Sequence, residues 1–95
     1  MLISLNELNL LIEATMVHLQ NDEAQKDNVA RLADTRRLLE AAHDAFHLTE
    51  FPSEPDSCDE LIKREENLLS DYDIDGLRHL AEAVRWIVQL CSSIR

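Results

Sequence analysis

The sequence predicts an all-α fold, a small up-and-down bundle of about four helices arranged as helical hairpins. The 95-residue chain contains one glycine and two prolines, and it is rich in leucine, alanine and glutamate, which favour helix. Apolar residues also recur every three or four positions through most of the chain, which is the period of an amphipathic helix. A chain of this length suits one helical domain, residues 1–95, with one modest core.

The first predicted helix begins at Ser4 and extends to about Gln20. Ser4 and Glu7 have the spacing of a capping box, and Ile3 and Leu8 would form the hydrophobic staple around it. One apolar stripe of this helix should face the core, and it consists of Leu5, Leu8, Ile12, Thr15 and Leu19.

The second predicted helix is longer. Asp22 and Gln25 offer a similar start, and the helical pattern continues past Phe46 until a loop that contains Pro52 and Pro55. Its core face consists of Leu32, Thr35, Leu39, Ala42 and Phe46.

Two further helices are predicted after this loop. Ser57 and Glu60 repeat the capping-box spacing, so the third helix should begin at Ser57 and end near Ser70. The fourth should begin at Asp73 as N-cap and extend to about Ser93. Its core stripe has the most regular spacing in the chain, and it consists of Leu77, Leu80, Val84, Ile87, Cys91 and Ile94.

The segment 71–82 resembles a single EF-hand calcium loop. Asp71, Asp73, Asp75 and Glu82 stand at its first, third, fifth and twelfth positions, with Gly76 at the sixth. The resemblance implies that the four carboxylates would bind calcium. The core stripe of the fourth helix already begins inside this segment, which favours a capped helix over a calcium loop, and calcium binding is kept as the alternative.

Acidic residues are concentrated between residues 50 and 75. Ten of them stand there against two basic residues, Lys63 and Arg64, so this stretch holds eight of the chain's ten net negative charges. Such a field attracts basic partners and repels nucleic acid and anionic membranes. We expect a protein partner with a basic, nucleic-acid-binding surface. The candidate partner-binding residues are Glu50, Glu54, Asp56, Asp59, Glu60, Glu65 and Glu66.

A second set of apolar residues lies away from the core stripes of the first and fourth helices. On a helical wheel Leu10 and Val17 lie opposite the first stripe, and Trp86 and Leu90 opposite the fourth. A helix that is apolar on two faces is either central in its fold or covered by another chain. We therefore expect a homodimer or a partner contact here, unless Trp86 packs on the loop that contains Phe51.

The sequence contains no arrangement that indicates catalysis. It shows no nucleophilic triad in a recognisable context, no glycine-rich phosphate loop and no paired carboxylates in an obvious pocket. The acidic neighbours of Cys58 should oppose thiolate formation, and Cys91 lies on a core stripe. His43 and His47 are one turn apart, which is half of a zinc-site spacing, but no further ligands can be named. We expect neither enzyme activity nor a cofactor.

The N-terminal region should be neither a signal peptide nor a membrane-spanning helix. Its apolar residues are interrupted by Asn6, Glu7, Asn9 and Glu13, and no basic region precedes them. Two cysteines are too few for a disulfide framework. We expect a cytoplasmic protein with reduced thiols.

In size and charge the chain resembles small acidic helical proteins of phages and bacteria, such as inhibitors of CRISPR effectors and immunity proteins against nuclease toxins. The resemblance concerns the class, because no motif of either family is present residue by residue. It implies an inhibitor or regulator whose carboxylates occupy a basic surface that the target otherwise uses for nucleic acid. The alternative is a calcium-binding or other metal-binding regulatory module.

Overall fold

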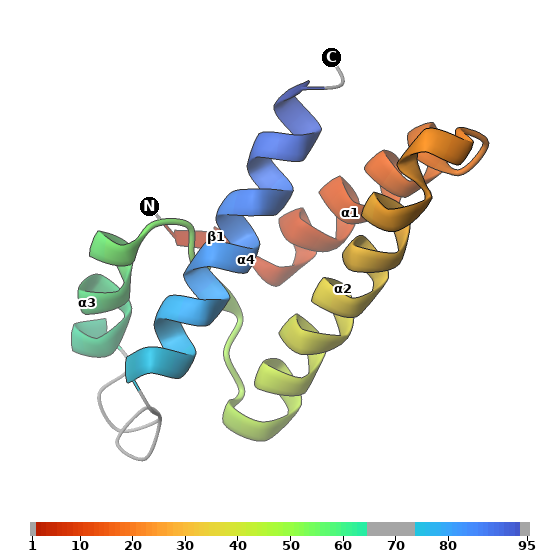
Figure 1. Ribbon diagram of the computed structural model, residues 1–95. Coiled ribbons are helices and arrows are strands. Elements are labelled where there is room, and N and C mark those ends of the chain that lie inside the picture. The colour runs from red at the N-terminus through yellow and green to blue at the C-terminus, as the bar shows by residue number, and fades with distance from the viewer. Residues whose placement is uncertain (1, 65–73, 94–95) are drawn as a thin grey trace.

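The computed structural model describes residues 2–64 and 74–93, which form four α-helices and one two-stranded sheet (Figure 1). This confirms the predicted all-α class. The elements in chain order are β1 (Leu2–Ser4), α1 (Leu5–Leu19), the short 3-10 helix η1 (Glu23–Gln25), α2 (Lys26–Phe46), β2 (Glu50–Pro52), α3 (Pro55–Arg64) and α4 (Ile74–Ser93).

The helices form two hairpins. In Figure 1, α1 and α2 lie side by side and run in opposite directions, and α3 and α4 form a second antiparallel pair. The two hairpins meet where α4 packs against α1, and β2 lies against both α3 and α4. Because α3 contacts only α4 and β2 among the larger packing contacts, it sits at one edge of the bundle.

The core contains the predicted stripes. The buried members are Leu8, Ile12, Thr15 and Leu19 of α1, Leu32, Thr35, Leu39 and Ala42 of α2, and Leu77, Leu80, Val84 and Ile87 of α4. Leu5, Phe46 and Cys91 are half-buried, and Ile94 lies outside the described residues. The core also includes Ile3 and Phe51, one from each strand.

The N-cap residues that the sequence predicts differ in their outcome. Ser4 is the N-cap of α1, because its Oγ accepts the backbone N–H of Glu7 at 3.2 Å. Asp22 instead caps the 3-10 helix, with Oδ1 accepting the N–H of Ala24 at 3.0 Å, so that α2 begins only at Lys26. The predicted N-cap Asp73 lies outside the described residues, and α4 begins at Ile74.

The start of α3 is a correction to the sequence prediction. The helix begins at Pro55 rather than at Ser57, since proline suits the first helical position, where its missing N–H has no partner to lose. Ser57 is buried inside the first turns, and its N–H donates to the carbonyl oxygen of Glu54 at 3.0 Å. The predicted end near Ser70 lies outside the described residues.

The sheet was not predicted. β1 and β2 are antiparallel, with Ile3 opposite Phe51, and the N–H of Leu5 donates to the carbonyl of Thr49 at 2.8 Å. Each strand has three residues, which is too short for an alternating pattern to be recognised. The sheet ties the start of α1 to the segment between α2 and α3.

Candidate protein-binding site

α3 is an amphipathic helix with a buried inner face and a charged outer face. The inner face comprises Ser57, Cys58 and Leu61, which are buried. The outer face comprises Asp56, Asp59, Glu60 and Lys63, whose spacing places them on one side of the helix, and all four are exposed. Glu54, also exposed, directly precedes the helix. We refer to Glu54, Asp56, Asp59 and Glu60 as the α3 acidic face.

Three carboxylates of the α3 acidic face have no basic partner in the part of the chain that the structure describes. Among the described residues, no Lys, Arg or His nitrogen lies within 4 Å of the carboxylates of Glu54, Asp56 or Asp59. The ion pairs on α2 show the contrast. There Arg36 lies 3.5 Å from Glu40, and Arg37 lies 3.5 Å from Asp34. The carboxylates of Glu40 and Asp34 on α2 are thus paired locally, whereas those of Glu54, Asp56 and Asp59 have no ion pair among the described residues.

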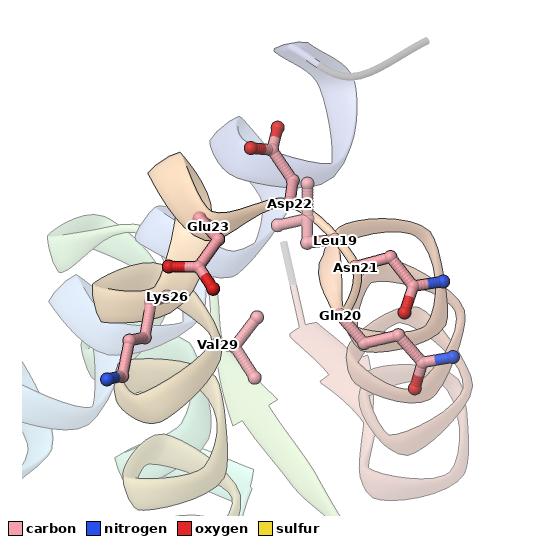
Figure 2. A pocket seen from close by; sticks show the side chains of 7 residues that line it. All are labelled: Leu19, Gln20, Asn21, Asp22, Glu23, Lys26 and Val29. Carbon is pink, nitrogen blue, oxygen red and sulfur yellow. The ribbon is translucent and has the colours of Figure 1, made fainter.

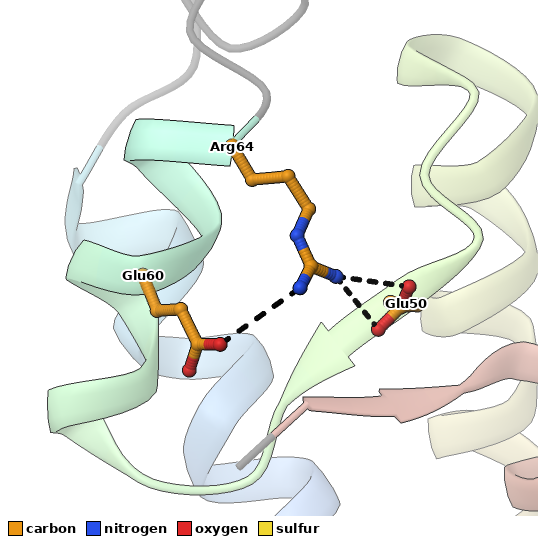
Figure 3. Close-up of polar contacts among 3 residues, drawn as sticks. All are labelled: Glu50, Glu60 and Arg64. Carbon is orange, nitrogen blue, oxygen red and sulfur yellow. Dashed lines mark hydrogen bonds and ion pairs between the residues drawn. The ribbon is translucent and has the colours of Figure 1, made fainter.

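Arg64 joins the end of α3 to β2. Its Nη1 donates to both carboxylate oxygens of Glu50, at 3.1 and 3.2 Å, and its Nη2 lies 4.0 Å from Oε1 of Glu60 (Figure 3). Figure 3 shows the guanidinium between the two carboxylates, one from each element. Of the predicted partner-binding residues, Glu50 and Glu60 are therefore partly neutralised, and Glu65 and Glu66 lie outside the described residues.

The field of the acidic face extends to the buried thiol beneath it. Burial raises the pKa of the Cys58 thiol, the nearby Asp59 carboxylate raises it further, and the Arg78 guanidinium of α4 opposes the shift in part. The thiol is therefore held protonated, in agreement with the expectation that its acidic neighbours oppose thiolate formation.

The segment with calcium-loop spacing is largely helical where it is described. Asp75 lies in the first turn of α4 and Glu82 further along the same helix, whereas Asp71 and Asp73 lie outside the described residues. A calcium loop needs a sharp turn at its sixth position, and Gly76 is already helical. The described backbone is thus helical from Ile74 onward, which favours a helix over a calcium loop in this part of the segment.

The four residues of the predicted apolar patch have different surroundings. Leu10 and Val17 are 67% and 60% exposed on the outer ridge of α1. Trp86 and Leu90 are half-buried and pack against the core. The guanidinium of Arg31 on α2 covers the Trp86 ring, 4.1 Å from its centroid. The helical wheel of α4 alone could not show this contact, because it depends on how α2 is placed.

His43 and His47 shape the end of α2. His47 adopts a left-handed conformation with φ 58° and ψ 28°, and its N–H donates to the carbonyl of His43 at 2.7 Å. The Nδ1 atom of His43 lies 2.9 Å from the carbonyl oxygen of Leu48. Since a carbonyl oxygen only accepts, Nδ1 must carry a hydrogen. Within residues 2–64 and 74–93 no three His, Cys, Asp or Glu side chains are grouped as metal ligands.

The tip of the first helical hairpin carries a surface hollow of about 470 Å³. Its lining residues are Leu19, Gln20, Asn21, Asp22, Glu23, Lys26 and Val29. Figure 2 shows that the amide ends of Gln20 and Asn21 extend to one side while the Asp22 carboxylate points away from them, so these polar groups do not face a common centre. Small-molecule sites generally have convergent polar groups, so this hollow does not have the features of a ligand site.

Comparisons of the chain with protein-family models, with curated proteins and with solved structures found no match. In the described part of the chain, no helix is both long and apolar enough to cross a lipid bilayer.

Proposed function

We propose that the protein binds a basic surface of another protein through the α3 acidic face, and that it thereby inhibits or regulates a nucleic-acid-binding protein. One observation carries the proposal. Glu54, Asp56 and Asp59 are exposed and lack a basic partner among the described residues, and they stand at the start of a helix whose inner face is buried.

The anchoring of α3 matters for affinity. Carboxylates on a packed helix keep their relative positions, so less conformational entropy is lost on binding than for charges on a mobile chain. On a basic surface that binds nucleic acid, these carboxylates would take the place of the phosphate groups, so the protein and the nucleic acid would compete for the same surface. Charges of this kind also accelerate encounter with a basic partner, and the acceleration decreases as salt increases.

The experiment is affinity capture from a nucleic-acid-rich lysate, followed by binding measurements on the purified partner over a salt series. The test variant reverses the α3 acidic face and consists of Glu54→Lys, Asp56→Lys, Asp59→Lys and Glu60→Lys. We expect its affinity to decrease by at least about 100-fold, because each charge in a complementary patch contributes a kcal/mol or so to binding. Wild-type affinity should also decrease steeply with salt.

The control variant makes the same change in net charge on exposed carboxylates elsewhere, and it consists of Glu7→Lys, Glu13→Lys, Glu23→Lys and Asp27→Lys. It should lose far less affinity. Circular dichroism of both variants checks that the helix content persists, because Asp56 also favours the N-terminus of α3. Equal loss in both variants would show that only net charge matters and would refute the proposed site.

We further propose that copies of the chain associate through the outer ridge of α1. The exposure of Leu10 and Val17, two turns apart on one helix face, supports this proposal. Light scattering at micromolar concentration should give the mass of a dimer, and the double variant Leu10→Ser with Val17→Ser should give that of a monomer. A monomer mass for the wild type at all concentrations would contradict association through α1.

A further inference from the structure

α3 has the smallest buried apolar face of the four helices in the described part of the chain. Its buried residues are Ser57, Cys58 and Leu61, and Leu61 is the only large aliphatic side chain among them. By contrast, α1 and α4 bury leucine, isoleucine or valine at successive turns. The described helix has ten residues, and helices shorter than about 12 residues are marginal on their own in water. α3 is therefore held in place by a small apolar contact.

The position of α3 allows it to separate from the bundle without disturbing the rest. It lies at one edge, where it packs against α4 and β2 (Figure 1). The contacts of α1 with α2 and with α4 do not include α3, so they would persist if α3 moved away. Regions with few buried apolar contacts are the ones that open locally while the remaining fold stays intact.

One polar contact ties α3 to the strand before it. Arg64, the last described residue of the helix, donates through Nη1 to both carboxylate oxygens of Glu50 in β2, at 3.1 and 3.2 Å (Figure 3). Glu60 lies on α3 itself, so its 4.0 Å contact with Arg64 moves with the helix. The ion pair of Glu50 with Arg64 joins the two ends of the segment 50–64 and has to break when α3 leaves.

We propose that α3 opens as a unit while α1, α2 and α4 remain packed, and that the ion pair of Glu50 with Arg64 is a clasp that limits this opening. The inference goes beyond the proposed function and would regulate its site. Asp56, Asp59 and Glu60 share one side of α3 only while the helix is formed, so the open state lacks the arrangement of carboxylates that a basic surface would bind. A partner that binds only the closed state would in turn keep α3 closed.

The opening is tested by hydrogen exchange with mass spectrometry on the whole protein without a partner. The amides of α3 should be at least about tenfold less protected than those in the buried turns of α1 and α4. Their opening should also depend only weakly on urea, because a small surface becomes exposed. Alkylation of Cys58, which is 3% exposed, reports the same opening at one side chain. Equal protection of α1, α3 and α4 would show a single cooperative unit and would overturn the inference.

The clasp is tested by Arg64→Gln, which should increase the alkylation rate of Cys58 about two- to fivefold, the range for one exposed ion pair. The control is Lys63→Gln, which removes the same charge from the neighbouring exposed position, where no ion pair is present among the described residues. It should change the rate by less than about 1.5-fold. Glu50→Gln should act like Arg64→Gln, and the two together should open α3 no more than either alone.

Equal effects of Lys63→Gln and Arg64→Gln, or fully additive effects of Glu50→Gln and Arg64→Gln, would overturn the clasp. Circular dichroism of each variant confirms that it is folded. None of these measurements uses a partner, so their failure is distinguishable from failure of the proposed function, which is tested by reversing the α3 acidic face against its charge-matched control.

Discussion

Phe51→Ala is expected to lower the free energy of unfolding by about 3–5 kcal/mol, the usual cost of removing a buried phenylalanine ring. The ring is fully buried, and its strand contacts both α3 and α4. Loss of the ring would leave a cavity where the sheet meets α3 and α4. The sheet and the two helices cannot all move inward to fill this cavity. The melting temperature should decrease by at least about 12 °C for a domain of this size.

Urea or thermal unfolding monitored by circular dichroism measures this effect. The control is Gln89→Ala, which shortens an exposed side chain of α4 and should change stability by less than about 0.5 kcal/mol. A cost of less than about 1 kcal/mol for Phe51→Ala would contradict the packing of β2 against the helices.

Cys58 should react with iodoacetamide at least about 100-fold more slowly than Cys91 in the folded protein at pH 8, because its reaction requires local opening of α3. Cys58 is 3% exposed and its thiol pKa is raised, whereas Cys91 is half-buried near the end of α4. Mass spectrometry of the alkylated peptides over time gives the two rates, and reaction in denaturant provides the reference. Similar rates in the folded state would contradict the burial of the inner face of α3.

The raised thiol pKa also predicts a dependence of stability on pH. The folded protein holds the Cys58 proton more tightly than the unfolded chain does. The resulting stabilisation is fully present below the ordinary pKa of a cysteine thiol and is lost as pH rises through the folded pKa. Stability measured by urea unfolding should therefore fall less between pH 8 and about pH 10 in Cys58→Ala than in the wild type.

The helices could be predicted because the residues that specify each helix are close to one another in the sequence. The N-cap at Ser4 and the regular stripe from Leu77 to Ile87 depend on residues within a few turns of one another. The exposure of Leu10 and Val17 followed from the same periodicity. The acidic character of α3 was likewise evident, since charge can be counted along the chain.

The remaining features depend on residues that are distant in sequence. The ion pair of Glu50 with Arg64 and the stacking of Arg31 on Trp86 require elements to meet in space, and no periodicity within one segment records this. The start of α3 was placed wrongly because Ser57 has capping-box spacing, but Ser57 already lies inside the helix, which begins at Pro55.

The junction between β1 and α1 has no connecting residue. Ser4 is both the last residue of the strand and the N-cap of the helix, so the register of the sheet sets the rotational phase of the helix. One inserted residue would turn every α1 side chain by about 100° relative to the strands. Leu8 and Ile12 would then leave the interior. This boundary cannot change length, whereas the exposed turn between α1 and α2 has room for insertions.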